Sequence, residues 1–157
     1  ESDVRCLAAE ATRGDVDHAL WELRYARRAL GLLVAERDAL DDRTASVVAQ
    51  ALQESLGRDP HIAADKLEIA RQQLNSRLRA YGEALQHRVP GITSSERLGR
   101  AMLGFAGAFP SPPLIARAGE LLALYVTEAN EALRREFGVA SPPEDLPPSA
   151  VRGARTG

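Results

Sequence analysis

The chain has 157 residues, the length of one domain, and a domain of this size buries about 70% of the surface that its unfolded chain exposes. Hydrophobic residues make up 45% and charged residues 27% of the sequence, proportions that exclude a wholly disordered chain. The formal net charge of −2 provides no overall positive field to attract nucleic acid or an anionic membrane surface, which counts against both kinds of partner.

Glycine and proline divide the first third of the chain into segments with helical periodicity. Residues 4–11 are long enough for one or two helical turns. Residues 16–40 follow Asp15, whose carboxylate suits the start of a helix, and they carry two neighbouring apolar stripes. Such a helix is expected to be central, within the monomer or at an interface. Residues 45–56, which Asp41 or its neighbours can cap, carry one stripe, and we expect them to form a helical hairpin with 16–40.

The clearest helical signal lies in residues 67–85. Apolar side chains recur there at intervals of three and four, a seam typical of a helix packed in a bundle. These side chains are Leu67, Ala70, Leu74, Leu78, Tyr81 and Leu85. The sequence Val89-Pro90-Gly91 is expected to end this helix, and Thr93, Ser94 or Ser95 to cap the next one.

Residues 98–109 combine large apolar side chains with three glycines. Because a glycine costs a helix about 1 kcal/mol relative to alanine, this composition indicates either loose structure or a need for close backbone approach. We therefore expect a tightly packed helix crossing here, with an apolar docking surface for a partner or a membrane as the alternative.

The last predicted helix begins among the prolines at 110–113, with Ser111 as its cap, and runs to Gly138. Its apolar face consists of Ile115, Ala118, Leu122, Tyr125, Ala129, Leu133 and Phe137. Residues 138–157 are rich in Pro, Gly and Ser and indicate an extended tail beyond a helical domain of residues 1–137. Since no strand pattern of convincing length appears, the expected fold class is all-α, a helical bundle of about five helices with an extended Pro/Gly-rich C-terminal tail.

Candidate metal ligands and catalytic groups are few. Asp15, His18 and Glu22 share one helix face, and Glu83 lies four residues before His87, but neither arrangement is the Glu-x-x-His pair of di-iron bundles. The sequence also contains no Gly-x-Ser-x-Gly nucleophile elbow and no phosphate-binding glycine loop. We therefore predict no catalytic residue, no metal site and no cofactor.

Two further features bear on the compartment. The single cysteine, Cys6, cannot form a disulfide within the chain. No apolar run reaches the roughly 18 residues of a transmembrane helix. We expect a soluble protein of the cytoplasm, or an exported one if an N-terminal signal peptide has been removed.

Positive charge is concentrated in the middle of the chain, where residues 60–104 carry seven basic and four acidic groups. The arginines concerned are Arg71, Arg77, Arg79, Arg88, Arg97 and Arg100. We expect them to form a solvated face paired internally with the acidic first third. The alternative is a patch for an acidic partner or for nucleic acid.

The two-sided apolar helix and the glycine-rich segment favour a non-catalytic interaction protein, either a self-associating subunit or an adaptor of a larger assembly. Its partner would be another protein or further copies of the chain. The expected interface residues are Trp21, Tyr25, Leu32, Met102, Leu103, Phe105 and Phe109.

The alternative hypothesis is a bundle that binds a small ligand or cofactor in a pocket between helices. The aromatic residues that would line this pocket are Trp21, Tyr25, Tyr81, Phe105 and Tyr125. Because aromatic residues make up only 4% of the sequence, such a pocket would use most of them.

Overall fold

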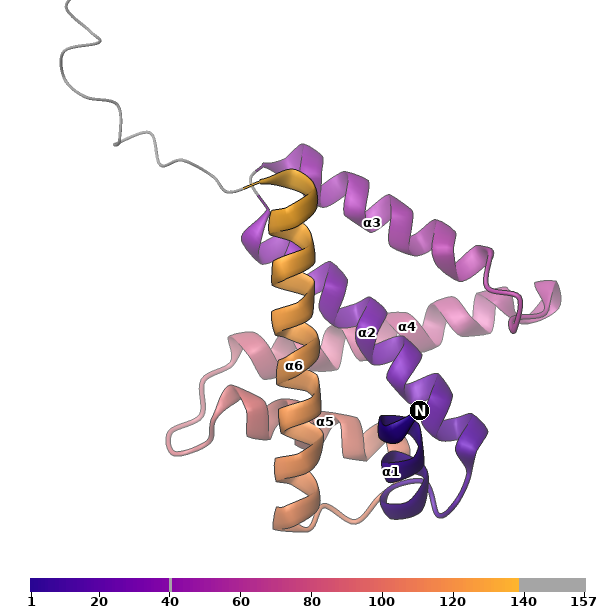
Figure 1. Ribbon diagram of the computed structural model, residues 1–157, viewed down its shortest axis with the longest axis vertical. Coiled ribbons are helices and arrows are strands. Elements are labelled where there is room, and N and C mark those ends of the chain that lie inside the picture. The colour runs from indigo at the N-terminus through magenta and orange to yellow at the C-terminus, as the bar shows by residue number, and fades with distance from the viewer. Residues whose placement is uncertain (40, 139–157) are drawn as a thin grey trace, which may run out of the picture.

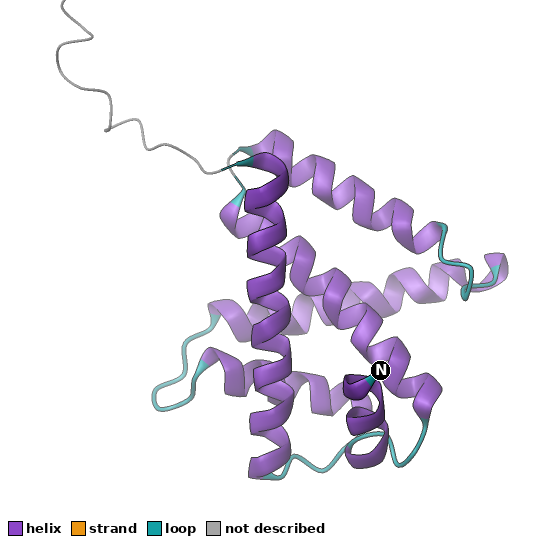
Figure 2. Cartoon of the chain, viewed as in Figure 1, coloured by secondary structure: helices purple, strands orange, loops and turns teal. Residues whose placement is uncertain are grey.

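The computed structural model describes residues 1–39 and 41–138, and within them it contains six α-helices, one short 3-10 helix and no β-strand (Figure 1, Figure 2). The elements are α1 (Ser2–Glu10), α2 (Val16–Asp38), α3 (Asp42–Gly57), η1 (Ala64–Lys66), α4 (Leu67–Gln86), α5 (Ser94–Ala106) and α6 (Pro112–Phe137). The all-α prediction is confirmed. The helices number six because the first segment forms a complete helix of its own, and the predicted tail from residue 139 onward lies outside the described residues.

Three of the predicted helix caps are confirmed. The Asp15 carboxylate accepts a hydrogen bond from the backbone N–H of His18 at 2.9 Å, at the start of α2. The Asp41 carboxylate accepts from the N–H of Thr44 at the start of α3, and the Thr93 hydroxyl accepts from the N–H of Glu96 at the start of α5. Ser111 precedes α6 without a side-chain hydrogen bond, and that helix instead begins with proline in its first turn, where no N–H is needed.

Helix α2 is the centre of the bundle, as its two apolar stripes predict. It contacts α1, α3, α4, α5 and α6, and Figure 1 shows it running through the middle of the molecule. Both stripes of α2 contribute to the core, including Leu23, Leu30, Leu32 and Val34. The apolar surface of this helix is therefore largely used within the monomer.

Helices α2 and α3 form the expected hairpin, but α3 lies at its edge (Figure 1). The only side chain of α3 that is fully buried is Leu56, near its C-terminal end. Val47 is half exposed, and Leu52 rests against Gly31 of α2. The α3 helix is thus held mainly through one end and one face.

The seam predicted on α4 is confirmed. Ala70, Leu74 and Tyr81 are buried, and the remaining leucines of the seam are half-buried against the core. The helix ends at Gln86, and the chain then reverses in a turn with proline second and glycine third. Gly91 has a φ of 76°, and the N–H of Ile92 donates to the carbonyl of Val89 at 3.1 Å, features of a type II turn.

The predicted close crossing is present between α5 and α6, the helix pair with the most extensive contact. A Cβ atom built on Gly99 would lie 2.8 Å from the backbone nitrogen and 3.2 Å from the Cα of Gly119. A Cβ atom on Gly119 would lie 2.9 Å from the carbonyl carbon of Ser95. By contrast Gly104 faces open space, and Gly107 ends α5 in a left-handed conformation. The crossing therefore requires one glycine on each helix.

The apolar face predicted on α6 is buried only in the first half of the helix. Tyr125 is the last fully buried residue, while Leu133 is half-buried and Phe137 exposed. Among the helices of the described chain, none combines the length and the apolar character needed to cross a bilayer.

Candidate protein interaction surface

The residues predicted to form an interface occupy three different environments. Tyr25, Leu32, Met102 and Leu103 are buried in the core of the chain itself. Trp21 and Phe105 are half-buried. Phe109 is 86% exposed, the most exposed of the large hydrophobic residues in the described chain. Of the predicted set, therefore, three side chains remain accessible on the folded chain.

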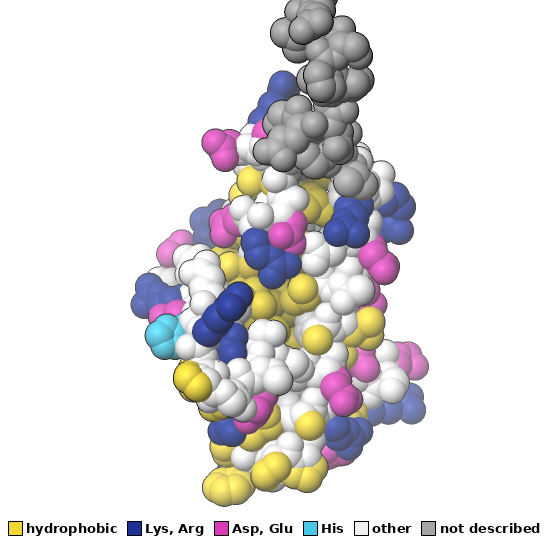
Figure 3. Space-filling model, turned by 90° about the vertical axis from the view of Figure 1, so that its left-hand side faces the viewer, with side chains coloured by type: hydrophobic (Ala, Val, Ile, Leu, Met, Phe, Trp, Pro, Cys, Tyr) yellow, Lys and Arg dark blue, Asp and Glu magenta, His cyan; other side chains and the backbone are white. Residues whose placement is uncertain are grey.

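Phe109 lies in the connection between α5 and α6. The positive φ of Gly107 turns the chain out of α5, and the N–H of Ser111 then donates to the carbonyl of Phe109 at 2.9 Å. Prolines at 110, 112 and 113 restrict the backbone on the C-terminal side. Figure 3 shows apolar side chains gathered at the lower end of the molecule, the end at which this connection lies in Figure 1. The loop thus presents an aromatic ring to solvent on a restrained backbone.

A groove of about 310 Å³ lies between α1, α5 and α6, and its lining includes Leu114 in the first turn of α6, five residues after Phe109. Its apolar lining is Leu7, Met102, Leu114, Ala118, Leu121 and Leu124. Leu124 is half exposed, whereas Met102 is fully buried and closes the bottom of the groove. Asp3, Arg117 and Glu120 add charged groups to the lining. We call this groove together with Phe109 the Phe109 surface.

One wall of the groove is α1, which packs on α2 through Leu7 and Ala8 and is tied to α6 by Arg117. The Arg117 guanidinium donates to the carboxylate of Glu10 and to the Cys6 sulfur, the latter at 2.8 Å. Burial, followed by the neighbouring Glu10 carboxylate, raises the pKa of the Cys6 thiol, so that it stays protonated at neutral pH. Cys6 therefore acts here as a neutral hydrogen-bonding group in a helix contact.

The aromatic residues predicted to line a ligand pocket gather in part. The rings of Trp21 and Tyr25 lie 5.8 Å apart, and those of Tyr81 and Phe105 lie 6.0 Å apart. Between the two pairs, the guanidinium carbon of Arg77 lies 4.2 Å from the Phe105 ring centroid and 5.0 Å from that of Tyr25. The Arg77 side chain thus occupies the space between these rings. Tyr125 lies elsewhere, beneath the guanidinium of Arg27 at 4.3 Å.

A buried ion pair holds this cluster together, whereas the sequence predicted Arg77 on a solvated face. Arg77 donates from Nε to Glu22 at 3.1 Å and from Nη2 to the other carboxylate oxygen, although the two residues are 55 positions apart. Gln73 accepts from Arg77 through its backbone carbonyl at 3.2 Å, and His18 approaches Glu22 at 3.5 Å. Burial, with the Glu22 charge adding to it, raises the pKa of Tyr81, whose hydroxyl has no hydrogen-bond partner among the described residues. The pair joins α2 to α4 inside the bundle.

Two of the remaining central arginines make contacts within α4, α5 and the turn between them. Arg97 fixes the α4–α5 turn by donating to the carbonyls of Ala84 at 2.8 Å and Ile92 at 2.6 Å. Arg100 pairs with Glu96 in its own helix at 2.9 Å. The expected pairing with the acidic first third is realised between Arg77 and Glu22, while the other pairs are local.

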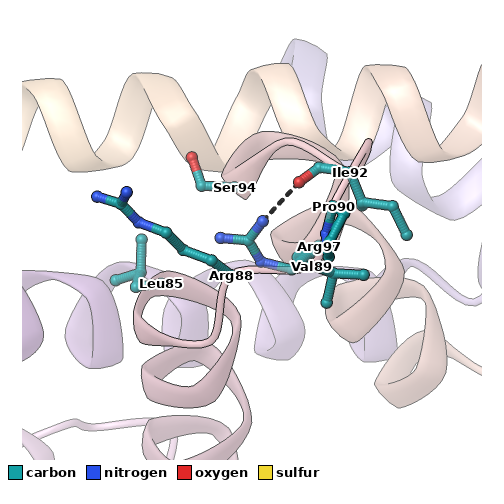
Figure 4. Close-up of a pocket in the computed structure, with 7 residues that line it drawn as sticks. All are labelled: Leu85, Arg88, Val89, Pro90, Ile92, Ser94 and Arg97. Atoms are coloured by element: carbon teal, nitrogen blue, oxygen red, sulfur yellow. Dashed lines mark hydrogen bonds between the residues drawn. The ribbon is translucent and has the colours of Figure 1, made fainter.

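A hollow of about 530 Å³ lies at the α4–α5 turn. Figure 4 shows the guanidinium groups of Arg88 and Arg97 pointing to the same side of it, next to Leu85 and Ser94. The dashed line in Figure 4 marks the hydrogen bond from Arg97 to Ile92. Arg97 thus has a structural function at the turn, and Arg88 is exposed at this hollow.

Within residues 1–39 and 41–138, no three His, Cys, Asp or Glu side chains are grouped so as to hold a metal ion. Comparisons with known protein families, with curated proteins and with solved structures found no match for this chain. A functional assignment therefore depends on the surfaces described above, and the Phe109 surface is the most apolar of them.

Proposed function

We propose that this chain is a non-catalytic interaction protein that associates with another polypeptide through the Phe109 surface. The observation that carries this proposal is the 86% exposure of Phe109, in the loop that leads into α6, together with the apolar groove that α6 lines. Aromatic side chains are enriched in the cores of protein interfaces, and a few of them commonly supply most of the binding energy.

The energetic argument starts from the cost of leaving Phe109 in water. Burying a phenylalanine side chain fully is favourable by about 1.5–3 kcal/mol, and this free energy is available only when a partner covers the ring. Because the loop is restrained by prolines and by the Ser111 hydrogen bond, little conformational entropy would be lost on binding. Exposure on a restrained loop is therefore suited to association.

The groove complements the exposed ring. Its apolar floor can receive a side chain of the partner, and Asp3, Arg117 and Glu120 give it a polar rim. A stable interface usually buries about 800 Å² on each partner, more than one ring provides, so the partner would also have to cover α1 and the start of α6. The partner that covers this area is either a second copy of the chain or a different polypeptide.

Native mass spectrometry of the protein gently purified from its own source tests the proposal. We expect a mass equal to a multiple of the chain, or to the chain plus another polypeptide. The variant Phe109→Ala should weaken the association about 30-fold, which corresponds to about 2 kcal/mol, without a loss of thermal stability because the ring is exposed.

The matched control is Ile69→Ala on α4, since Ile69 is also a large exposed hydrophobic residue but lies outside the Phe109 surface. It should leave the association unchanged. A complex that survives Phe109→Ala with the affinity of the wild type would contradict the proposal. A monomer carrying a small added mass would favour the alternative function, a bundle that binds a small ligand. The groove volume of 310 Å³ lies at the lower end of the range that small-molecule sites occupy.

A further inference from the structure

A second surface feature is a hollow of about 660 Å³ between the middle of α2 and the end of α3. Four arginines line it together with one carboxylate, although the first third of the chain is acidic overall. The lining residues are Arg24, Arg27, Arg28, Ser55, Arg58, Asp59, Pro60 and His61. We call it the arginine hollow, and it is separate from the Phe109 surface.

The base of the arginine hollow is a fixed ion pair. Arg28 donates from Nη2 to Asp59 at 2.9 Å and from Nε to the Ser55 hydroxyl at 3.4 Å. Asp59 also accepts from the backbone N–H of His61 at 3.0 Å. Although burial opposes ionisation, these hydrogen bonds lower the pKa of Asp59 to about 2. The Asp59 carboxylate thus contacts both Arg28 and His61, and among the described residues no second carboxylate lines the hollow beside Arg24, Arg27 and Arg58.

The Arg28 guanidinium still has an unused donor. Its Nη1 is buried and has no hydrogen-bond partner among the described residues. A buried donor left without an acceptor costs about 1–3 kcal/mol, more for a charged group. The contacts of Arg28 with Asp59 and Ser55 therefore leave part of its guanidinium group without a hydrogen-bond partner among the described residues.

The neighbouring arginines are oriented by aromatic rings. The Arg24 guanidinium lies over the Trp21 ring at 5.0 Å, and that of Arg27 lies over the Tyr125 ring at 4.3 Å. Such stacking restricts the side chains, so that less entropy is lost when the guanidinium binds a ligand. The clustered charges also have a cost, because like charges at i, i+3 and i, i+4 on one helix repel each other by a few tenths of a kcal/mol.

The acids at the rim balance this charge only weakly. Arg58 pairs with Glu54 at 2.8 Å and Arg27 with Glu128 at 3.6 Å, and all four side chains are largely exposed. Exposed pairs contribute at most about 1 kcal/mol, so a more highly charged anion can replace the carboxylates as the partner of these arginines.

We propose that the arginine hollow binds a phosphate group, carried by a phosphomonoester or present as inorganic phosphate. The planar guanidinium fork matches the oxygens of a phosphate with two parallel hydrogen bonds, and charge-assisted bonds of this kind are the strongest available to a protein surface. Carboxylate ligands carry less charge per group and would compete poorly with the existing Asp59, Glu54 and Glu128 contacts.

Isothermal titration calorimetry of the full chain tests this assignment, with inorganic phosphate and O-phosphoserine as probes at low, fixed ionic strength. We expect saturable binding of at least one probe. Tighter binding of phosphoserine would identify an ester as the ligand source, and tighter binding of inorganic phosphate would identify the free ion. Absence of binding by both probes would overturn the proposal.

The key variant is the double substitution Arg24→Gln and Arg58→Gln, which removes two cations of the hollow and leaves the Arg28–Asp59 pair in place. We expect the affinity for phosphate to fall at least 10-fold. The matched control, Arg71→Gln with Arg79→Gln on α4, removes the same total charge outside the hollow and should change the affinity less than 3-fold.

Two more variants locate the site. Arg88→Gln alters the hollow at the α4–α5 turn, and Phe109→Ala alters the proposed protein interface; both should bind phosphate like the wild type. Loss of binding in Arg88→Gln, with retention in the double variant, would assign phosphate to the other hollow and overturn the proposal. Circular dichroism of each variant verifies that the helices are intact.

Discussion

Alanine substitutions at two glycines of α5 are expected to change the stability of the fold in opposite directions. At Gly99, an alanine Cβ would lie 2.8 Å from the backbone nitrogen of Gly119, well inside an ordinary contact of 3.4 Å or more. Because the obstacle is backbone, relief requires the two helices to separate. At Gly104, in the same helix, an alanine Cβ would meet nothing within 4 Å.

The magnitudes follow from the two environments. Overpacking of a well-packed contact costs about 1–3 kcal/mol, and a backbone obstacle belongs at the upper end of this range. The higher helix propensity of alanine offsets about 1 kcal/mol of this cost, so Gly99→Ala should destabilise the fold by about 2 kcal/mol. Gly104→Ala should stabilise it by up to about 1 kcal/mol, because only the propensity changes.

Urea denaturation followed by circular dichroism measures both effects, with thermal melts as a second readout. For a chain of this size about 2 kcal/mol corresponds to a melting temperature lower by about 4–8 °C, and the gain at Gly104 to a rise of up to about 2–4 °C. A Gly99→Ala protein as stable as the wild type would refute the close crossing. A Gly104→Ala protein that is strongly destabilised would refute the open environment of that residue.

Two other predictions concern buried charges. Glu22→Gln should destabilise the fold by about 3–5 kcal/mol in urea denaturation, because it leaves the buried Arg77 charge without a counter-ion. Replacing both residues together, by Glu22→Leu and Arg77→Met, should restore much of the lost stability. Equal losses in the single and the double variant would contradict the pairing. Asp59, with a folded-state pKa of about 2 against an ordinary value of about 4, contributes stability that is complete above pH about 4 and is lost as the pH falls toward 2. Asp59→Asn should lower the stability at pH 7 by about 1–3 kcal/mol. It should also reduce the fall in melting temperature between pH 6 and pH 2. A fall as large as that of the wild type would argue against the Asp59 contacts.

Local features of the fold could be predicted from the sequence. The starts of α2, α3 and α5 follow from Asp15, Asp41 and Thr93, because a cap needs only a side chain and an N–H three residues away. The seam of α4 follows from its spacing. The close crossing could be predicted from the glycines around Gly99, but its partner Gly119 could not, since tertiary packing decides which backbone approaches.

The location of the candidate sites was harder to predict. Periodicity marks Met102 and Leu103 as apolar, but core and interface are both apolar, and the structure buries these two side chains within the chain. Phe109 is exposed because it lies past the end of α5, a boundary that sequence signals define poorly. One feature of the sequence indicates the buried pair of Glu22 and Arg77: Arg77 lies among the apolar positions of the α4 seam.

That pair also has a consequence for helix register. Because the α4 seam repeats every three or four residues, a slip of α4 along α2 by one turn, about 5.4 Å, would still set apolar side chains against apolar side chains. The same slip would separate Arg77 from Glu22 and leave two unpaired charges in the core, at a cost of several kcal/mol. A single ionic contact therefore discriminates between alignments that hydrophobic burial alone would tolerate.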